Sequence, residues 1–291
     1  MKKGLIIINA FSTRGGQEYQ ADRLLQEFKA LGVEIKVITN LLTAYIDCDK
    51  IKANIPDCDF VIYLDKDRHL AEMLELAGYK LFNSARSIYL CDDKMATYIA
   101  LAGHDIAMPF TISSPLNYSP TGSFNELETQ ICSKLSFPIV VKQCFGSFGQ
   151  QVSLINNVTE LREIYARLKG LPHLYQQYIA SSYGFDNRII VIGGKVYASM
   201  LRRNENDFRS NLELGGVGSK IEPKQSFIDM AEKVASVLNL DYCGVDIMFD
   251  QNSQPILCEV NSNAFFKGIE SVTGINVASG YAQHIYNKIY K

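Results

Sequence analysis

Oxygen-bearing side chains alternate along the segment LCEVNSN near the end of the chain. Glu259, Asn261 and Asn263 occupy every second position there. Side chains two residues apart on a strand share a face, so a strand at 255–261 would turn Glu259 and Asn261 to the same side. The preceding segment, CGVDIMFD at 243–250, reads as a partner strand.

The connection QNSQ predicts how these two strands pair. If Asn252 and Ser253 form a two-residue turn, residues whose numbers sum to 505 lie opposite each other, and Asp246 faces Glu259. Directly opposed carboxylates repel each other, so a cation must compensate. Hard oxygen ligands of this kind suit Mg²⁺, which is usually held by carboxylates together with substrate phosphates. The alternative is a solvated hairpin face on which polar residues alternate.

A phosphate site would complete such a metal site. Lys142 ends the apolar segment FPIVVKQ, and the loop FGSFGQQ at 145–151 follows. Gly146 and Gly149 would let backbone N–H groups approach a phosphate, and Ser147 adds a hydroxyl. An ordinary hairpin turn is the alternative, because neither a Walker loop nor a Rossmann fingerprint is present. Lys94, near the start of a helix, could equally be a surface charge.

Arg209 and Asn211 lie two residues apart in the polar loop RRNENDFRSNLELGG. The rigid, planar guanidinium group of arginine suits phosphate or carboxylate groups. Two further arginines, Arg202 and Arg203, precede Arg209 at the end of a predicted strand. A solvated loop is the alternative. The four histidines are scattered without metal-ligand spacing, so a zinc site is not expected.

The elements that position these residues predict an α/β and α+β chain. Strand and helix patterns alternate over 1–82, which indicates a small parallel α/β domain. The segment 83–103 reads as helical, and a smaller α+β unit follows. Gly193-Gly194 predicts a hairpin between the strands NRIIVI and KVYASML. Three units are therefore expected: 1–90, 91–172 and 173–291. The further strands are expected at 4–9, 33–38, 59–64, 137–143, 151–155 and 174–179, and the helices at 69–78, 124–135, 158–169, 225–239 and 276–289.

Composition excludes several classes of protein. The formal charge of −2 argues against a nucleic-acid binder, which usually carries a basic surface. No segment approaches the roughly 18 consecutive apolar residues of a membrane helix. The seven cysteines form no C-x-x-C pair, and four of them lie in apolar segments, as reduced thiols do. A cytoplasmic protein is expected.

Taken in order, six blocks resemble the ATP-grasp superfamily and, within it, the RimK-like carboxylate–amine ligases. DFRSNL and GIESVTGI look like RimK, and NSARSIYLCDDKMAT looks like LysX. The resemblance covers roughly 83–289 and implies an ATP-grasp fold, with 1–90 as the preceding domain. The six blocks are FPIVVKQCFGSFGQQV, YQQYI, GFDNRIIVIGGKV, RRNENDFRSNLELGG, GVDIMFD and CEVNSNAFFKGIESVTGINVA.

The resemblance also implies roles for individual residues. Lys94 and Lys142 would bind the ATP phosphates, under a loop formed by Gly146, Ser147, Phe148 and Gly149. Gln176, Gln177, Tyr178 and Ile179 would lie beside adenine, with Asp186 near the ribose. Asp246, Glu259 and Asn261 would hold Mg²⁺, for which Mn²⁺ could substitute. Arg209 and Asn211 would be catalytic, facing the γ-phosphate and the acyl phosphate.

The implied reaction joins a carboxylate to an amine through an acyl phosphate and releases ADP and phosphate. The substrate would be a small-molecule amino acid or peptide, or the carboxylate of a protein or carrier protein. No nucleic acid or membrane partner is expected, and a homo-oligomer is compatible with the family. The alternatives are an ATP-grasp kinase and an ATP-binding regulator without turnover.

The chain departs from the family pattern in three ways. Gln177 stands where the family often has an acidic residue, and Gln151 stands where the phosphate loop often has a further glycine. Phe265 and Phe266 follow the metal-binding asparagine, where many relatives have small residues and proline. We expect both phenylalanines at the entrance for the acceptor substrate, narrowing it or stacking on the substrate.

Overall fold

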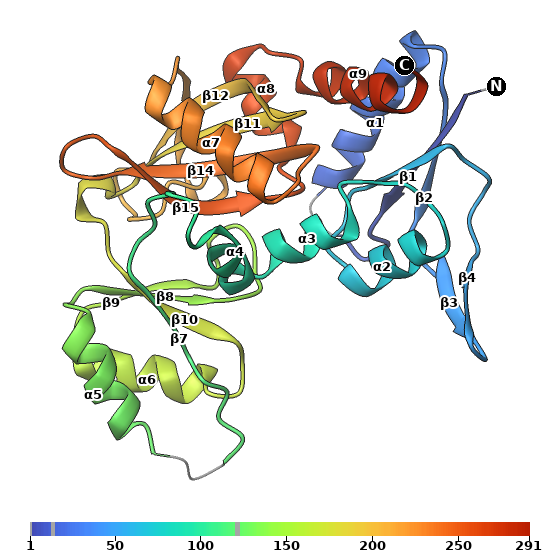
Figure 1. Ribbon diagram of the computed structural model, residues 1–291. Helices are drawn as coiled ribbons and strands as arrows, with labels where there is room; N and C mark the ends of the chain where they lie inside the picture. The colour runs from blue at the N-terminus through green and yellow to red at the C-terminus, as the bar shows by residue number, and fades with distance from the viewer. Residues whose placement is uncertain (1, 13–14, 120–122) are drawn as a thin grey trace.

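The computed structural model describes residues 2–12, 15–119 and 123–291. Its first unit is a parallel sheet of β1 (Lys3–Ile8), β2 (Glu34–Thr39), β5 (Phe60–Tyr63) and β6 (Leu81–Phe82), in the order β2-β1-β5-β6. The helices α1 (Gly16–Ala30) and α2 (Arg68–Leu76) connect its strands, which confirms the parallel α/β unit. A ribbon of β3 (Ala44–Asp47) and β4 (Lys50–Ala53), which the sequence pattern did not predict, extends from it (Figure 1).

The predicted helical segment 83–103 forms two helices, α3 (Ala85–Asp92) and α4 (Lys94–Leu101). Asp93 has extended backbone angles and ends α3. Its carboxylate then accepts hydrogen bonds from the N–H groups of Met95 and Ala96, so it caps α4. This break places Lys94 on the first turn of a new helix.

A central antiparallel sheet follows, in the order β7-β10-β8-β9. Its strands are β7 (Thr111–Ser113), β8 (Ile139–Gln143), β9 (Val152–Ile155) and β10 (His173–Gln177). The helices α5 (Asn125–Lys134) and α6 (Val158–Leu168) cover one face, and residues such as Ile139, Tyr175 and Leu161 form a core between them. The division of the chain at 90 and 172 stays a prediction, and β10 pairs within this central sheet.

The C-terminal sheet is antiparallel, in the order β13-β12-β11-β14-β15. The hairpin predicted at Gly193-Gly194 joins β11 to β12, and both glycines have positive φ. Helix α7 packs on one face, while α8 and α9 pack on the other. These elements are β11 (Phe185–Ile192), β12 (Lys195–Arg203), β13 (Val217–Lys220), β14 (Tyr242–Phe249), β15 (Pro255–Asn261), α7 (Gln225–Val237), α8 (Phe266–Thr273) and α9 (Val277–Tyr290).

The predicted two-residue turn between β14 and β15 is wrong, although Asp246 does lie opposite Glu259. Near the turn the paired numbers sum to 504, as for Phe249 and Pro255, and Ser253 has a φ of 60°. A left-handed residue in this place is typical of a three-residue hairpin loop. The register then shifts between Asp246 and Ile247, and this bulge restores the predicted pairing of the two carboxylates.

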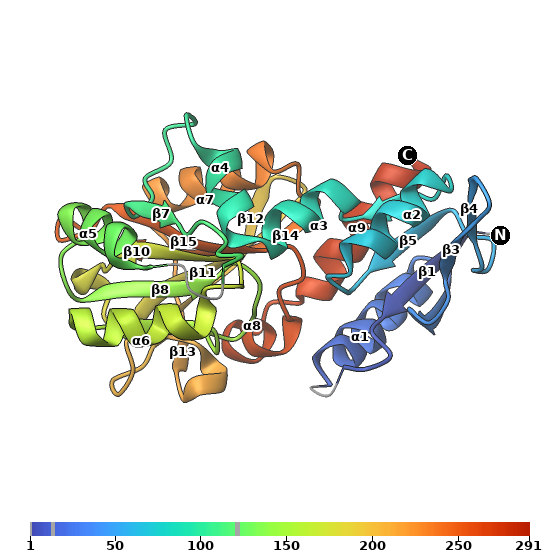
Figure 2. The same cartoon turned by 90° about the horizontal axis from the view of Figure 1, so that it is seen from below.

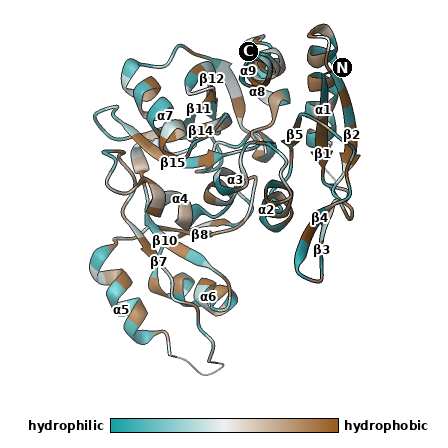
Figure 3. Cartoon of the chain, turned by 45° about the vertical axis from the view of Figure 1, so that its right-hand side comes forward, coloured by the Kyte–Doolittle hydropathy of each residue, from teal (hydrophilic) through white to brown (hydrophobic). Residues whose placement is uncertain are grey.

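The first unit and the C-terminal sheet share one hydrophobic core. Phe28, Phe60 and Phe82 belong to the same buried cluster as Tyr242 and Tyr281. Figure 2 shows α9 beside the N-terminal elements, and the central sheet lies apart with its own core. Surface helices carry hydrophilic and hydrophobic residues side by side, as amphipathic helices do (Figure 3). No helix within the described residues has both the length and the apolar character needed to cross a membrane.

Candidate active site

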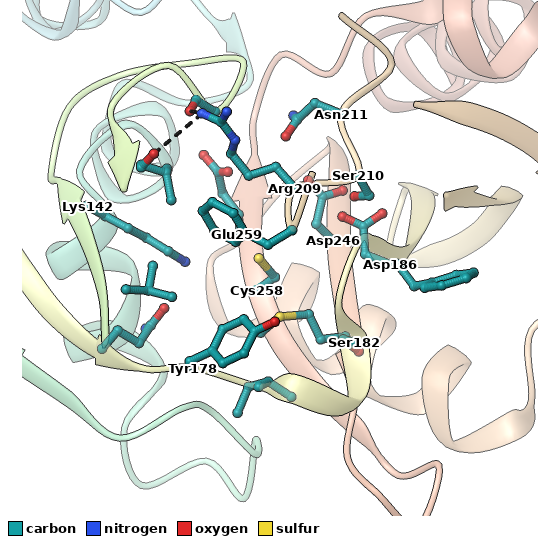
Figure 4. A pocket seen from close by; sticks show the side chains of 18 of the residues that line it. Lys142, Tyr178, Ser182, Asp186, Arg209, Ser210, Asn211, Asp246, Cys258 and Glu259 are labelled. Atoms are coloured by element: carbon teal, nitrogen blue, oxygen red, sulfur yellow. Dashed lines mark hydrogen bonds between the residues drawn. The ribbon is translucent and has the colours of Figure 1, made fainter. Parts of the chain in front are cut away.

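A pocket of about 740 Å³ lies between the central sheet and the C-terminal sheet. Val140 and Lys142 from β8 line one side, and Asp246 and Met248 from β14 line the other. Figure 4 shows Lys142 reaching in from its strand, with Asp186 and Asp246 on the opposite side. The central lobe and the C-terminal sheet therefore form this pocket together.

Lys142 brings a buried positive charge into the pocket. Only 7% of the residue is exposed, and it lies on the central strand β8, paired with Leu174 and Val152. Burial alone would lower the pKa of its ammonium group, but nearby groups, Tyr98 and Cys258 first and then Glu259 and Asp246, outweigh burial and raise the pKa. Lys142 is therefore protonated at neutral pH and available to an anion.

Asp246 and Glu259 are neutralised by different cations. Arg188 and Arg202 both bind the Asp246 carboxylate, and Arg202 Nη2 lies 3.0 Å from Asp246 Oδ2. Burial would raise the pKa of Asp246, but the two guanidinium groups hold it below its usual range. Glu259 behaves in the same way, with Lys94 as its main cation, 3.4 Å from Glu259 Oε1. Both carboxylates are ionised at neutral pH.

The predicted metal ligands form a suitable set of donors. Asp246 and Glu259 face each other on β14 and β15, and Asn261 stands two residues further along β15. Two carboxylates and one amide oxygen are hard donors, which Mg²⁺ prefers. No group of three or more His, Cys, Asp or Glu side chains in the described chain could hold a metal, so such a site depends on the Asn261 oxygen.

The loop at 146–149 is held from several sides. Lys94 Nζ donates to the Gly146 carbonyl at 3.0 Å, and Lys66 Nζ donates to Ser147 Oγ at 3.1 Å. Gly146, Phe148 and Gly149 all have positive φ, which only glycine adopts without cost. A Cβ on Gly146 would come within 2.5 Å of Gln151 Oε1. Gln151, the departure noted in the sequence, therefore packs under the loop.

Arg209 lines the pocket, but its guanidinium group is largely used within the protein. It forms a two-pronged ion pair with Asp207 and donates to the Gly149 carbonyl at 2.6 Å. This hydrogen bond connects the loop at 202–216 to the loop at 146–149. Asn211 precedes the short helix Leu212–Leu214 and lines this pocket, as well as a second pocket described below.

The four residues predicted beside adenine lie together at the end of β10. All of Gln176, Gln177, Tyr178 and Ile179 line the pocket. Gln176 donates to Thr111 Oγ1 at 2.8 Å, and Gln177 exchanges hydrogen bonds with the backbone of Phe110. These two amide side chains are bound to β7 and to Phe110, the residue before it. Main-chain groups and apolar surfaces are therefore left to face a ligand. Asp186 also lines the pocket, and its carboxylate is paired with Arg202.

A second pocket, with about 1130 Å³ of empty space, adjoins the first. Arg202, Asn211 and Glu259 line both pockets. The second pocket is closed on its far side by the N-terminal unit, through Ser12, Gln17, Asp65 and Lys66. The two pockets therefore meet at the predicted metal ligand Glu259.

The expectation that both phenylalanines stand at the acceptor entrance is wrong for Phe266. Phe266 is fully buried in the shared core and packs edge-on against Tyr242. Phe265 does line the second pocket and lies 5.8 Å from the ring of Phe148. Adjacent residues at the start of α8 point to opposite sides, so only one of them can reach the pocket.

Sequence reasoning missed Arg188 and Lys66. Arg188 stands two residues after Asp186 on β11 and faces Asp246 across the sheet, so the period of two was a usable signal. Lys66 follows β5 in the N-terminal unit. Ligands often bind outside the carboxyl ends of parallel strands, and that rule could have singled it out.

Residues 91–285, more than half of the chain, match the family model of the RimK-like ATP-grasp domain. The match begins just before α4 and covers both sheets that form the first pocket. It therefore includes every residue named above in the first pocket.

The proteins that resemble the chain include two curated relatives and one solved structure. It is 31% identical over 245 residues to N-acetylaspartylglutamate synthase A of Homo sapiens, covering 84% of this chain and 60% of that protein. It is 32% identical over 219 residues to a probable alpha-L-glutamate ligase of Maridesulfovibrio salexigens, covering 74% and 70%. The RimK domain protein ATP-grasp from Sphaerobacter thermophilus has the same fold, with a TM-score of 0.73 at 18% identity and coverage of 97% and 99%.

Proposed function

Because the chain belongs to the RimK-like ATP-grasp family and is an ATP-dependent carboxylate–amine ligase, we propose that its amine substrate is an acidic amino acid such as glutamate. One observation carries the proposal. The second pocket shares Glu259 with the first and presents the ammonium group of Lys66, whose side chain is 31% exposed, whereas its two arginines are paired with buried aspartates. Both named relatives refer in their names to glutamate or to a compound that contains it.

We assign the nucleotide to the first pocket. Gln176 to Ile179 would lie along adenine, Asp186 would lie near the ribose, and Lys94 and Lys142 would bind the phosphates. The loop Gly146 to Gly149 would cover them. The support is the burial of both ammonium groups: Lys142 lines the pocket, and Lys94 is paired with Glu259 in its wall. Charge–charge contacts strengthen where water is excluded.

Asp246, Glu259 and Asn261 would hold Mg²⁺. The ion supplies charge neutralisation at the transferred phosphoryl group and at the leaving oxygen. Arg188 and Arg202 contact both oxygens of Asp246, so Mg²⁺ would share this carboxylate with them or displace one of them. We expect Mn²⁺ to replace Mg²⁺, because both accept hard oxygen ligands.

The residues of the chain act mainly by position and charge. Lys94 and Lys142 orient the phosphate groups, and Asn211, which lines both pockets, would face the acyl phosphate formed when the substrate carboxylate attacks the γ-phosphorus. Arg209 keeps the loop over the nucleotide through Gly149. The amine then attacks the acyl carbon, phosphate leaves, and an amide remains. Such chemistry needs no nucleophile on the protein.

A substrate screen tests the proposal. The protein is incubated with ATP, Mg²⁺ or Mn²⁺, a pool of small carboxylic acids, and either glutamate, glutamine or no amine. Mass spectrometry then seeks products whose mass equals acid plus amine minus water. We expect amide products and ADP release with glutamate. Amide products with glutamine but none with glutamate would refute the acidic-amine proposal while leaving the ligase activity intact.

The Lys142→Met variant, with Lys134→Met as a matched control, separates specific turnover from background. Lys142 is buried beside both carboxylates, and Lys134 is exposed on α5. We expect Lys142→Met to lose product formation by about 100-fold or more, as removal of an electrostatic group from such a site does. Lys134→Met should match the wild type, and equal activity in both variants would refute the assignment of Lys142.

A further inference from the structure

Three cations line the second pocket, but the charges of two of them, Arg188 and Arg202, are already compensated by buried aspartates. Arg188 uses two guanidinium nitrogens on Asp246, and Arg202 divides its nitrogens between Asp186 and Asp246. Only 3% of the Arg202 side chain is exposed. An incoming anion would therefore gain less from either arginine, because a buried aspartate already offsets the charge of the guanidinium group.

Lys66 differs from both arginines. Its Nζ donates to Ser147 Oγ at 3.1 Å and lies 3.4 Å from Asp92 Oδ1, and 31% of its side chain is exposed. An ammonium group can donate three hydrogen bonds. Lys66 therefore keeps donor capacity for a ligand in the pocket.

The backbone beneath Lys66 is firmly held. Asp65 Oδ1 accepts from the N–H of Lys66 at 2.8 Å. Asp65 Oδ2 accepts from Asn9 Nδ2 at 3.1 Å and from Asn40 Nδ2 at 3.0 Å. These residues follow β5, β1 and β2, so three parallel strands fix the position at their carboxyl ends. A group placed on such a rigid base can select a ligand by position.

The strand order also favours a ligand at this place. The chain runs from β1 to β2 on one side and then to β5 on the other side of β1. In open α/β sheets, ligands bind at the crevice where the order reverses in this way. Ser12 and Gln17 from the β1 side and Lys66 from the β5 side all line the second pocket.

We propose that Lys66 binds the side-chain carboxylate of the acidic amine substrate and thereby sets the preference for an acidic over a neutral amine. The proposal rests on the proposed function and deepens it. The N-terminal unit then supplies the substrate selectivity, while the two antiparallel sheets supply the nucleotide site. Lys66 is therefore a specificity residue.

The test compares glutamate with glutamine, which differ in charge but hardly in size. For Lys66→Met we expect the KM for glutamate to rise about tenfold or more, as loss of a partly buried charge pair implies. The KM values for glutamine and for ATP should change by less than about twofold, so the preference collapses. Lys66→Arg should retain most of the preference, because it keeps the charge.

Two further variants separate selectivity from folding and from the loop contact. Lys52 of β4 is also a lysine paired with an aspartate, at Asp47, but it lies outside both pockets, so Lys52→Met should keep the wild-type preference. Ser147→Ala removes the loop partner and keeps the ammonium group, so it should keep the preference even if kcat falls. Lys66→Gln replaces Lys66→Met if the latter does not fold.

The outcomes are distinct. Equal losses with glutamate and glutamine in Lys66→Met, together with a higher KM for ATP, would mean that Lys66 only holds the loop, and would overturn the inference. An unchanged preference would overturn it as well. A wild type that ligates no acidic amine would refute the proposed function first, and this inference with it, before any variant is made.

Discussion

At the scale of single residues, the site depends on buried charges that are compensated one by one. Arg188 and Arg202 compensate Asp246, while Lys94 is the main cation beside Glu259. A buried carboxylate left without its cation is strongly destabilising. The compensation keeps both carboxylates ionised, which is the form that binds a divalent cation.

Phe265 and Phe266 give a prediction from neighbouring residues with opposite surroundings. Phe266→Ala should lower the free energy of unfolding by about 3–5 kcal/mol, because it empties a fully buried ring site. Phe265→Ala should cost about 1 kcal/mol and widen the second pocket, which shifts the preference toward bulkier amines. Urea unfolding and competition between amines of different size measure the two effects. The assignment would be contradicted if Phe266→Ala alone changed amine preference.

Individual residues of the site show what the sequence could and could not predict. The alternation of Glu259 and Asn261 predicted their shared side, because strand geometry has a fixed period of two. The helical start at Phe266 has no side-chain cap, so no local signal told which phenylalanine would face the core. The pairing of Asp246 with Glu259 was correct although the turn was wrong, because an unpredicted bulge compensated for the longer loop.

At the scale of elements, short contacts between chain-distant segments fix the geometry. Lys94 stands where it does because Asp93 ends one helix and caps the next, a signal that local sequence carries. The contacts of Lys66 with Ser147 and of Arg209 with Gly149 join segments far apart in the chain. Nothing in a single sequence reports such contacts, so the position of the loop at 146–149 could not be predicted.

Asp241, at the start of β14, links that strand to α9 and gives a pH-dependent prediction. Its Oδ1 accepts from His284 Nε2 at 2.7 Å and from Lys288 Nζ at 2.6 Å. Burial would raise the pKa of the carboxyl, but these two partners lower it overall. A lowered folded pKa means that the stabilisation is present above the unfolded pKa and is lost as the pH falls through the folded pKa.

We therefore expect Asp241→Asn to be less stable than the wild type by about 1 kcal/mol near pH 6, with the difference shrinking below about pH 4. Denaturant unfolding across this range measures it. Asp229→Asn, an exposed aspartate of α7, should differ little from the wild type at any pH. A difference for Asp241→Asn that grows as the pH falls would contradict the assignment.

At the scale of the whole molecule, two bodies meet at the first pocket. The N-terminal unit and the C-terminal sheet share a core, whereas the central sheet has its own. Asn83 joins the first two: its Nδ2 donates to the carbonyls of Tyr242 and Ser262, and its Oδ1 accepts from the N–H groups of Asp241 and Tyr242. Parallel strand–helix alternation predicted the N-terminal unit, but the shared core depends on α8 and α9 and had no local signal.

Asn83→Ala should therefore weaken the joint between the N-terminal unit and the C-terminal sheet. Buried backbone groups would lose their partners, each at a cost of about 1–3 kcal/mol, so we expect a loss of about 3 kcal/mol in all. Asn287→Ala, at an exposed position of α9, is the control and should change stability little. Thermal unfolding compares them. Equal melting temperatures for the two variants would show that Asn83 does not join the units.

In the proposed mechanism, the two adjoining pockets couple ATP cleavage to amide formation through an acyl phosphate. The most direct measurement uses a carboxylic acid substrate labelled with ¹⁸O in its carboxylate and follows the label by mass spectrometry of the released phosphate. The mechanism predicts one ¹⁸O in phosphate for each amide formed, with ADP as the other product, because the attacking carboxylate oxygen leaves with the phosphoryl group. Amide formation with unlabelled phosphate, or with AMP and pyrophosphate, would contradict it.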